Sequence, residues 1–373
     1  MLLMPELFPT SQQPTAGIFI LDQLKALSTF ADVDIYHTHL WKPGDYLQLE
    51  DLGQEQFHLL SKKPSLPWHK LAYPLWEQEA FRYARSWQPP DVLHLHGASL
   101  RGPLAMRLAR LWECPLVITE HTGPWSSISE RPLLLRRARR AIESADLLLP
   151  VSTHLSQEIA DSGIRPRRIE VLGNPLDTDF FSLRSKPLGA AKRILFLGRW
   201  DAFKGALRSL QAFIHIAGRI PDFRISIAGM GEESEALHKL ARESKLGDRI
   251  EIIEAAMSRE AMRGHFHRSS FLVFPSLHES FGLVAAEAMS TGLPVVITNR
   301  TGPRDYFQPS VGVQVEPDSI DGLSASMLHM AQHLSVFEPQ EVRRGVVERY
   351  SLEQYAGHLR RLYTEVIDSM ART

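Results

Sequence analysis

Residues 271–289 read FLVFPSLHESFGLVAAEAM: an apolar run, then a polar loop, then a run of small and apolar residues. This pattern predicts a buried strand that ends at Phe274 and a helix that starts near Gly282. Ligands of open α/β sheets bind outside the carboxyl ends of the strands, which is where this polar loop lies. The segment therefore predicts a parallel α/β fold with a binding site at residues 275–282.

The first turn of the expected helix supplies backbone donors. The N–H groups of Phe281, Gly282 and Leu283 lack acceptors within the helix and can bind an anion. Glu279 precedes the helix and Glu287 lies more than one turn inside it, so both carboxylates can face one crevice. There, the loop carboxylate of Glu279 can accept hydrogen bonds from sugar hydroxyls, and the carboxylate of Glu287 can accept them from a pair of ribose hydroxyls. Spacing alone fits equally well a helix N-terminal charge at Glu279 and a solvated helix residue at Glu287.

A second strand-to-helix turn lies upstream, where residues 197–205 read LGRWDAFKG. Arg199 and Lys204 at this turn can neutralise a diphosphate, the arginine through its planar fork and the lysine as a point charge. Taken singly, two surface cations on a loop are the commoner interpretation.

Short apolar runs alternate with helical patterns along most of the chain, which predicts parallel sheets covered by helices on both faces. The runs form two series, separated by an aperiodic segment rich in Ser, Lys, Pro and Gly at 182–192. We therefore expect two Rossmann-like doubly wound domains, residues 1–185 and 190–350, and an amphipathic helix at 352–373. The expected strands are 31–36, 92–95, 116–119, 147–151, 193–197, 224–228, 250–253, 271–274 and 294–297.

Composition limits the class of protein. The 373 residues carry a net charge of −1, which gives the chain no general attraction to nucleic acid. Cys114 is the only cysteine, which excludes an intramolecular disulfide framework and fits a reducing compartment. The opening MLLMPE is too short and too soon charged for a signal peptide, and no apolar run approaches the length of a membrane span. These features lead us to expect a cytoplasmic protein.

The two loop segments resemble the donor site of retaining family 4 glycosyltransferases of the GT-B fold. The motifs that carry this resemblance are a G-R-x-x-x-x-K-G loop and an E-x7-E element within P-S-x-x-E-x-F-G. Individually weaker matches follow in the family's order at Gly17, His94 with His96, His121, Asn174 with Asp177, and Gly229 with Gly231. The resemblance implies two Rossmann-like domains that face a cleft, with the helix 352–373 packing back on the first.

The resemblance also implies roles for residues of the second domain. Arg199 and Lys204 would hold the diphosphate, Glu287 the ribose and Glu279 the transferred sugar. Gly229 would let its loop approach the base or the phosphates of the nucleotide.

In the first domain the resemblance implies two further site residues. His121 would lie near the reacting sugar, and Gly17 would let the backbone approach the donor phosphate or the acceptor. The sequence departs from the family where Gly17 stands alone instead of in a Gly-Gly pair, at Pro175 after Asn174, and at Asp305, where many relatives carry glutamate.

The implied activity is transfer of a glycosyl group from a nucleoside diphosphate sugar, with retention of configuration, to a glycan, lipid-linked or small-molecule acceptor. We expect neither a metal nor a separate cofactor. Asp177 of Asp177-Thr178-Asp179 is accounted for by its match to the family together with Asn174, and the pairs His94/His96 and His37/His39 lack assignable remote ligands. A non-catalytic nucleotide-sugar binding protein and a sugar phosphorylase or epimerase of the same architecture are the alternatives. A nicotinamide site at 229–234 is disfavoured because the third glycine is missing.

Four arginines, Arg136, Arg137, Arg139 and Arg140, gather in the expected helix 133–144 beside three leucines. A basic helix with an apolar edge can lie on an anionic membrane, whereas a solvated helix face is the commoner interpretation. Peripheral contact with the inner face of an anionic membrane is therefore an open alternative.

Overall fold

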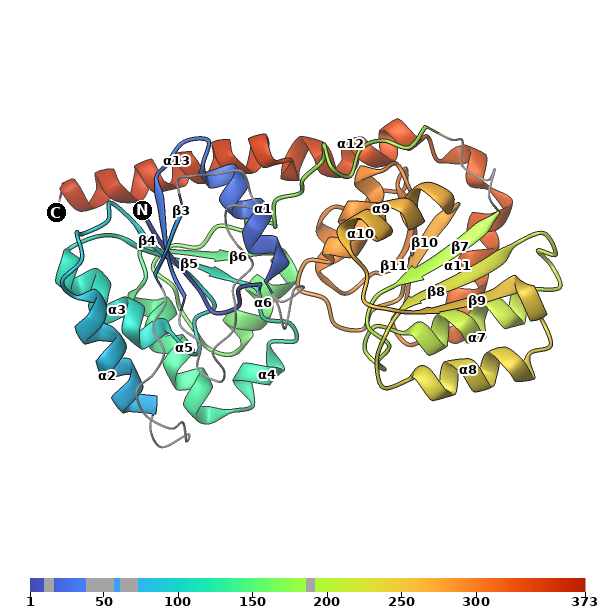
Figure 1. Ribbon diagram of the computed structural model, residues 1–373, viewed down its shortest axis with the longest axis horizontal. Helices are drawn as coiled ribbons and strands as arrows, with labels where there is room; N and C mark the ends of the chain where they lie inside the picture. Colours follow the sequence, from blue (N-terminus) through green and yellow to red (C-terminus); the bar gives the residue numbers. More distant parts are fainter. Residues whose placement is uncertain (10–16, 38–56, 61–72, 186–191, 373) are drawn as a thin grey trace. The chain divides into compact units, whose positions relative to one another are not determined.

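The computed structural model describes residues 1–9, 17–37, 57–60, 73–185 and 192–372 (Figure 1). The chain divides into two compact units. Unit 1 comprises Met1–Pro175 with Leu352–Thr373, and unit 2 comprises Leu176–Ser351. Each unit contains one six-stranded sheet in which all the recorded strand pairs are parallel.

The sheet of unit 1 has the order β3-β2-β1-β4-β5-β6. Its strands are β1 (Leu2–Pro5), β2 (Val33–Tyr36), β3 (Phe57–Leu60), β4 (Leu93–His96), β5 (Leu116–Glu120) and β6 (Leu147–Pro150). Its helices are α1 (Ile18–Leu27), α2 (Tyr73–Ala84), α3 (Gly102–Trp112), α4 (Ser126–Ser129), α5 (Pro132–Ser144), α6 (Thr153–Asp161) and α13 (Leu352–Ala371). Helices α1 and α13 cover one face, and α2, α3 and α5 cover the other (Figure 1).

The sheet of unit 2 has the order β12-β11-β10-β7-β8-β9. Its strands are β7 (Arg193–Leu197), β8 (Arg224–Gly229), β9 (Ile250–Glu254), β10 (Phe271–Phe274), β11 (Val295–Thr298) and β12 (Gly312–Val315). Its α-helices are α7 (Ala206–Ile216), α8 (Ser234–Glu243), α9 (Arg259–Arg268), α10 (Leu283–Ser290), α11 (Ile320–Gln332) and α12 (Pro339–Tyr350), and its 3₁₀ turns are η3 (Gly247–Arg249), η4 (Gly302–Asp305) and η5 (Leu334–Val336).

The two sheets share one topology, which fixes where a ligand can bind. In each, the direction of winding reverses between the first and fourth strands of the unit, β1 and β4 in unit 1 and β7 and β10 in unit 2. The loops after these strands diverge to opposite faces and leave a crevice at the carboxyl edge. Strands β6 (LLLP) and β10 (FLVF) are buried along their whole length, which fits their apolar sequences. Strands β4 (LHLH) and β5 (LVITE) are equally buried although they carry polar side chains.

The division between the units falls before Leu176, not within residues 182–192 as the composition suggested. The Leu176 N–H donates to the Tyr350 carbonyl (2.7 Å), and the Arg184 N–H donates to the Thr291 carbonyl (3.1 Å). The Arg184 guanidinium also donates to the Ser269 carbonyl (2.6 Å). Residues 176–184 therefore belong to unit 2, because their hydrogen bonds go there.

The C-terminal helix α13 completes the core of unit 1. Tyr355, Leu359, Leu362 and Val366 on its apolar stripe join the cluster that contains Leu24 of α1. Within the described residues, no helix combines the length and the apolar character that crossing a membrane requires.

We expect Leu359→Ala to destabilise the protein by about 2–5 kcal/mol, because a fully buried leucine leaves a cavity that neighbours fill only in part. The neighbouring Arg360→Gln is the control, since that side chain is exposed. Urea unfolding followed by circular dichroism measures both variants. Equal unfolding midpoints for the two would show that α13 contributes little to the core.

Candidate functional site

Two loops of unit 2 contact each other at the carboxyl edge of its sheet, where a ligand is expected to bind. The β7 loop (residues 198–205) and the β10 loop (residues 275–282) follow the two strands between which the winding reverses. The Leu277 N–H donates to the Phe203 carbonyl at 2.7 Å, so the loops are joined backbone to backbone. Both segments singled out in the sequence therefore build one edge of the sheet.

The side chains of Lys204 and Glu279 form an ion pair across this junction. Their side chains are 20% and 14% exposed, so the pair is largely withdrawn from water and weakly screened. The Lys204 ammonium also lies 6.0 Å from the centre of the Phe274 ring, at the end of β10. The structure thus brings together the cation and the carboxylate that the sequence suggested separately.

Arg199 lies on the same loop but in a different environment. Its side chain is 74% exposed, and its guanidinium is 3.0 Å from the Asp201 carboxylate. Asp201 also accepts a hydrogen bond from the Lys204 N–H (2.8 Å), which closes a local turn. The sequence analysis did not single out Asp201, although aspartate is favoured in turns because its carboxylate can accept from a nearby backbone N–H.

A second residue that the sequence analysis missed is Arg208 on α7. Its guanidinium donates to the Ala202 carbonyl (2.6 Å) on the β7 loop and to the Pro275 carbonyl (3.1 Å) on the β10 loop. Burial lowers the pKa of this arginine from its ordinary value, with Asp318, Glu233 and Asp201 acting in the opposite direction. Arg208 therefore links the β7 loop to the β10 loop through its guanidinium.

Helix α10 begins as the sequence predicted, at Gly282. This glycine caps the helix with a left-handed backbone (φ 85°), and its carbonyl accepts from the N–H groups of Ala285 and Ala286. A Cβ atom here would lie 2.5 Å from Pro303 and 2.8 Å from the Tyr306 hydroxyl, so only glycine fits. The N–H groups at the start of α10, including that of Leu283, face out of the helix end.

Phe281 contributes through its core packing. Its buried ring lies 5.5 Å from the ring of Tyr306 and 5.2 Å from that of Tyr350, both edge-on. The side chain is thus an anchor that fixes the start of α10, and any ligand contact at this residue falls to its backbone.

Glu287 is 5% exposed, which excludes its interpretation as a solvated helix residue. Its carboxylate lies 4.0 Å from the Arg259 guanidinium of α9. Burial is the main cause that holds the pKa of Tyr306 well above its usual range, followed by the charge of Glu279, with Tyr350, Asp305 and Glu287 as smaller causes. That Glu279 and Glu287 face one crevice stays a prediction.

Gly229 and Gly231 let the β8 end pack against the β7 loop. A Cβ atom on Gly229 would lie 1.9 Å from the Gly198 carbonyl oxygen, and one on Gly231 would lie 2.4 Å from that of Trp200. The Trp200 N–H donates to the Met230 carbonyl (2.9 Å). In this structure the glycines of the G-M-G sequence therefore let the backbone after β8 approach the backbone of residues 198–200, which includes Arg199.

In unit 1, Gly17 caps α1 with a left-handed backbone (φ 72°). A Cβ atom there would lie 2.5 Å from the Leu7 carbonyl oxygen, so the glycine lets α1 begin directly against the segment after β1. Residues 15 and 16, which precede it in the sequence motif, lie outside the described residues.

His121 is part of a histidine cluster at the carboxyl ends of β4 and β5. Its Nε2 lies 2.8 Å from Nδ1 of His96, and the two rings stack with their centres 5.1 Å apart. The Phe19 ring covers His121 at 4.2 Å. Burial lowers the pKa of His121 to about 3, against the opposing effect of the Asn174 side chain, and lowers that of His96 well below its ordinary value. Both imidazoles are therefore neutral near pH 7.

His94, the other histidine of the H-x-H sequence, has structural partners. Its ring nitrogens lie 2.5 Å from the Tyr363 hydroxyl and 2.7 Å from the Thr119 hydroxyl. These bonds join β4 to β5 and to α13. Among the described residues, no group of three or more His, Cys, Asp or Glu side chains is placed to hold a metal ion; His39 lies outside them.

Two carboxyl groups support this cluster. Glu120 accepts hydrogen bonds from the N–H groups of Ala98, His121 and Thr122, each at 3.0 Å. Glu6 accepts from the Leu100 N–H at 2.7 Å. Burial, with the charge of Glu120 as the next cause, raises the pKa of Glu6 to about 7.

The raised pKa of Glu6 predicts a pH-dependent stability. The contribution of Glu6 to the free energy of unfolding is fully present below the ordinary glutamate pKa of 4.5, and it is lost as pH rises through about 7. Glu6→Gln, which keeps an acceptor for the Leu100 N–H, should flatten the fall in melting temperature between these values. The exposed Glu353→Gln is the control. Parallel melting curves for Glu6→Gln and the wild type across this range would contradict the assignment.

Comparison with known proteins supports one family. A glycosyl transferase 4-like domain model matches residues 17–175, and a glycosyl transferases group 1 model matches residues 181–332. A glycogen synthase of Mycobacterium tuberculosis is 29% identical over 258 residues, 65% of this chain and 60% of the relative, so the chain spans less than two thirds of that protein. A D-inositol 3-phosphate glycosyltransferase of Corynebacterium aurimucosum is 27% identical over 327 residues, 76% of each chain.

Solved structures agree on the fold. Anabaena HepE in complex with UDP and glucose superposes with a TM-score of 0.76 at 15% identity, covering 97% of this chain and 99% of that one. The sucrose-phosphate synthase of Thermosynechococcus elongatus superposes with a TM-score of 0.77 at 17% identity, and the match covers 99% of each chain. With both units matched by family models and the whole chain matched in fold, this protein belongs to the glycosyltransferases of family 4 type and has the GT-B fold.

Proposed function

We propose that this protein transfers a glycosyl group from a nucleoside diphosphate sugar to an acceptor, with retention of configuration and without a metal. The observation that carries the proposal is the junction of the β7 and β10 loops, where the Lys204–Glu279 pair lies at the carboxyl edge of the sheet beside the first turn of α10. HepE, which shares the fold, binds UDP and glucose, and a Xanthomonas oryzae relative, 26% identical over 250 residues, is a GDP-mannose-dependent mannosyltransferase.

We assign the donor diphosphate to Lys204, Arg199 and the N–H groups at the start of α10. As the bond from the anomeric carbon to the diphosphate breaks, negative charge grows on the leaving oxygen. Lys204 is fixed by Glu279 and partly removed from water, so its charge acts at short range in a medium that screens it weakly. The exposed Arg199 contributes less, because water screens it.

The two carboxylates then serve the two sugars of the donor. Glu279 follows β10 and accepts hydrogen bonds from the transferred sugar, where its charge also stabilises a developing positive charge at the anomeric carbon. Glu287 accepts the two ribose hydroxyls, with Arg259 at 4.0 Å to balance its charge. In unit 1, we assign the neutral imidazole of His121 to a hydroxyl of the transferred sugar.

Retention is proposed to follow a front-face route. The leaving phosphate accepts the proton of the acceptor hydroxyl as that hydroxyl attacks, so the leaving group and the nucleophile share one face of the sugar. No side chain then has to act as a covalent nucleophile.

A panel of UDP, GDP and ADP sugars tests the function directly. We expect release of the nucleoside diphosphate from one donor class in the presence of a sugar acceptor, with an α-linked donor giving an α-linked product by proton NMR. Turnover should persist after exhaustive chelation with EDTA. Tight donor binding without turnover over a broad acceptor panel would favour a non-catalytic binding protein, and a β-linked product would exclude retention.

Lys204 and Arg199 should differ in their effects on catalysis. We expect Lys204→Ala to lower kcat by about 10²–10³ without unfolding, since it removes a charge that stabilises the transition state. Arg199→Ala should lower kcat by less than about tenfold because that charge is screened. The exposed Lys239→Ala on α8 is the matched control. Unchanged kcat in the folded Lys204 variant would remove the main anion contact from the proposed site.

A further inference from the structure

Helices α3 and α5 of unit 1 pack side by side (Figure 1). Side chains of both helices line an open surface hollow of about 840 Å³. We call this hollow the arginine groove. Its lining includes six arginines, two from α3, three from α5 and one from the segment after α6: Arg107, Arg110, Arg136, Arg137, Arg140 and Arg167. Among the described residues, the acidic ones in this lining are Glu77 and Glu143. A protein with a net charge of −1 thus concentrates positive charge on one face.

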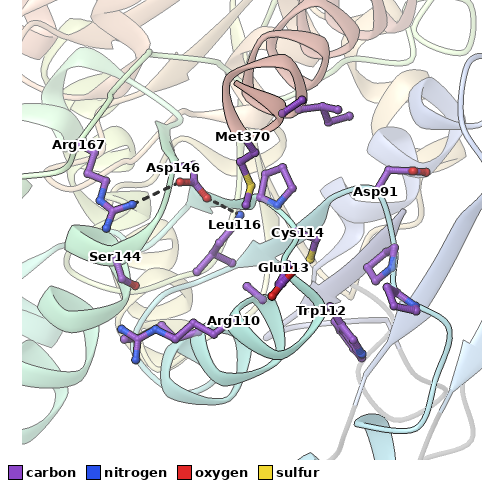
Figure 2. Close-up of a pocket in the computed structure, with 17 residues that line it drawn as sticks. Asp91, Arg110, Trp112, Glu113, Cys114, Leu116, Ser144, Asp146, Arg167 and Met370 are labelled. Atoms are coloured by element: carbon purple, nitrogen blue, oxygen red, sulfur yellow. Dashed lines mark hydrogen bonds and ion pairs between the residues drawn. The ribbon is translucent and has the colours of Figure 1, made fainter. Parts of the chain in front are cut away.

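Two of the arginines have clear structural roles. The Arg137 guanidinium lies 3.2 Å from the Glu77 carboxylate and donates to the carbonyls of Ser99 and Leu100. The Arg167 guanidinium lies 3.5 Å from the Asp146 carboxylate; Figure 2 draws this ion pair as a dashed line. These two are therefore largely compensated within the chain.

Of the other four, Arg107 lies with its guanidinium 4.0 Å from the centre of the Phe81 ring. Arg110, Arg136 and Arg140 are exposed, and within the described part of the chain they are recorded in no ion pair. Arg136 and Arg140 are one helical turn apart on α5, a spacing at which like charges destabilise a helix. An anion bound in the groove would relieve this repulsion. The fork of each guanidinium matches two oxygens of a phosphate.

Exposed apolar side chains accompany the charges. Leu133 lines the arginine groove and is 70% exposed, and Leu111 is exposed next to Arg110. A neighbouring hollow of about 830 Å³ shares Arg110 and Arg167 and adds the exposed Met370 (Figure 2). A soluble phosphate would make no use of these apolar groups, whereas a bilayer surface offers phosphates and hydrocarbon side by side.

We propose that the arginine groove binds the phosphate headgroups of an anionic lipid bilayer, with Leu133 inserted between them. The proposal is independent of the donor site, because none of its residues lies in unit 2.

Vesicle sedimentation tests the proposal. The full chain should bind vesicles of equal parts phosphatidylglycerol and phosphatidylcholine, but not vesicles of phosphatidylcholine alone. The double variant Arg136→Gln/Arg140→Gln should bind the anionic vesicles about 25-fold more weakly, at roughly fivefold for each arginine. Arg242→Gln/Arg360→Gln, which removes the same charge from exposed sites elsewhere, should bind as the wild type does.

Leu133→Ser separates a bilayer from a soluble anion. Because Leu133 is exposed, its replacement should leave the fold intact, and the variant should bind anionic vesicles more weakly. In a separate competition experiment, inorganic phosphate should displace the protein from vesicles no better than chloride does at equal ionic strength. Circular dichroism confirms folding of every variant. Wild-type protein that ignores anionic vesicles, or a double glutamine variant that binds them normally, would overturn the proposal. The proposal would also be overturned if binding of a fluorescent oligonucleotide depended on Arg136 and Arg140 while vesicle binding did not depend on them.

Discussion

The hydrogen bond from the Leu277 N–H to the Phe203 carbonyl, 2.7 Å long, joins the loops after β7 and β10. In a doubly wound sheet these loops diverge to opposite faces, so their meeting has to be built by specific contacts. Lys204 and Glu279 form their ion pair only because the two backbones are held at this distance. Arg208 reinforces the junction by donating to carbonyls of both loops. This contact and the hydrogen bonds of Arg208 together fix where the Lys204–Glu279 pair lies.

Glycines make the junction sterically possible. Gly229 allows the end of β8 to lie against the Gly198 carbonyl, where a Cβ atom would stand 1.9 Å away. Gly282 allows α10 to begin under Pro303 and Tyr306. Any other residue at either position would push apart the backbones that carry Arg199 and Glu279. These glycines therefore act on the site through packing.

Local pattern sufficed for much of this protein. Strands 193–197 and 271–274 have the predicted bounds, because each is a continuous apolar run flanked by clear loop signals. Strands β1 (LLMP), β3 (FHLL) and β12 (GVQV) were missed. The unit boundary at Leu176, the burial of Glu287 and the pairing of Lys204 with a residue 75 positions away depend on tertiary contacts. Such contacts leave no periodic trace in a sequence.

The shared topology supports different chemistry in the two units. In unit 2 the loop after β7 carries Lys204 and Arg199, and the loop after β10 carries Glu279, which pairs with Lys204. In unit 1 the corresponding edge carries Glu6, whose pKa is raised to about 7, and His121, whose pKa is lowered to about 3. Because the strand order is the same, burial and residue identity set this difference. Cations fixed on the β7 loop suit a diphosphate and an uncharged imidazole suits hydroxyl groups, so we infer that the donor's charge is handled by unit 2.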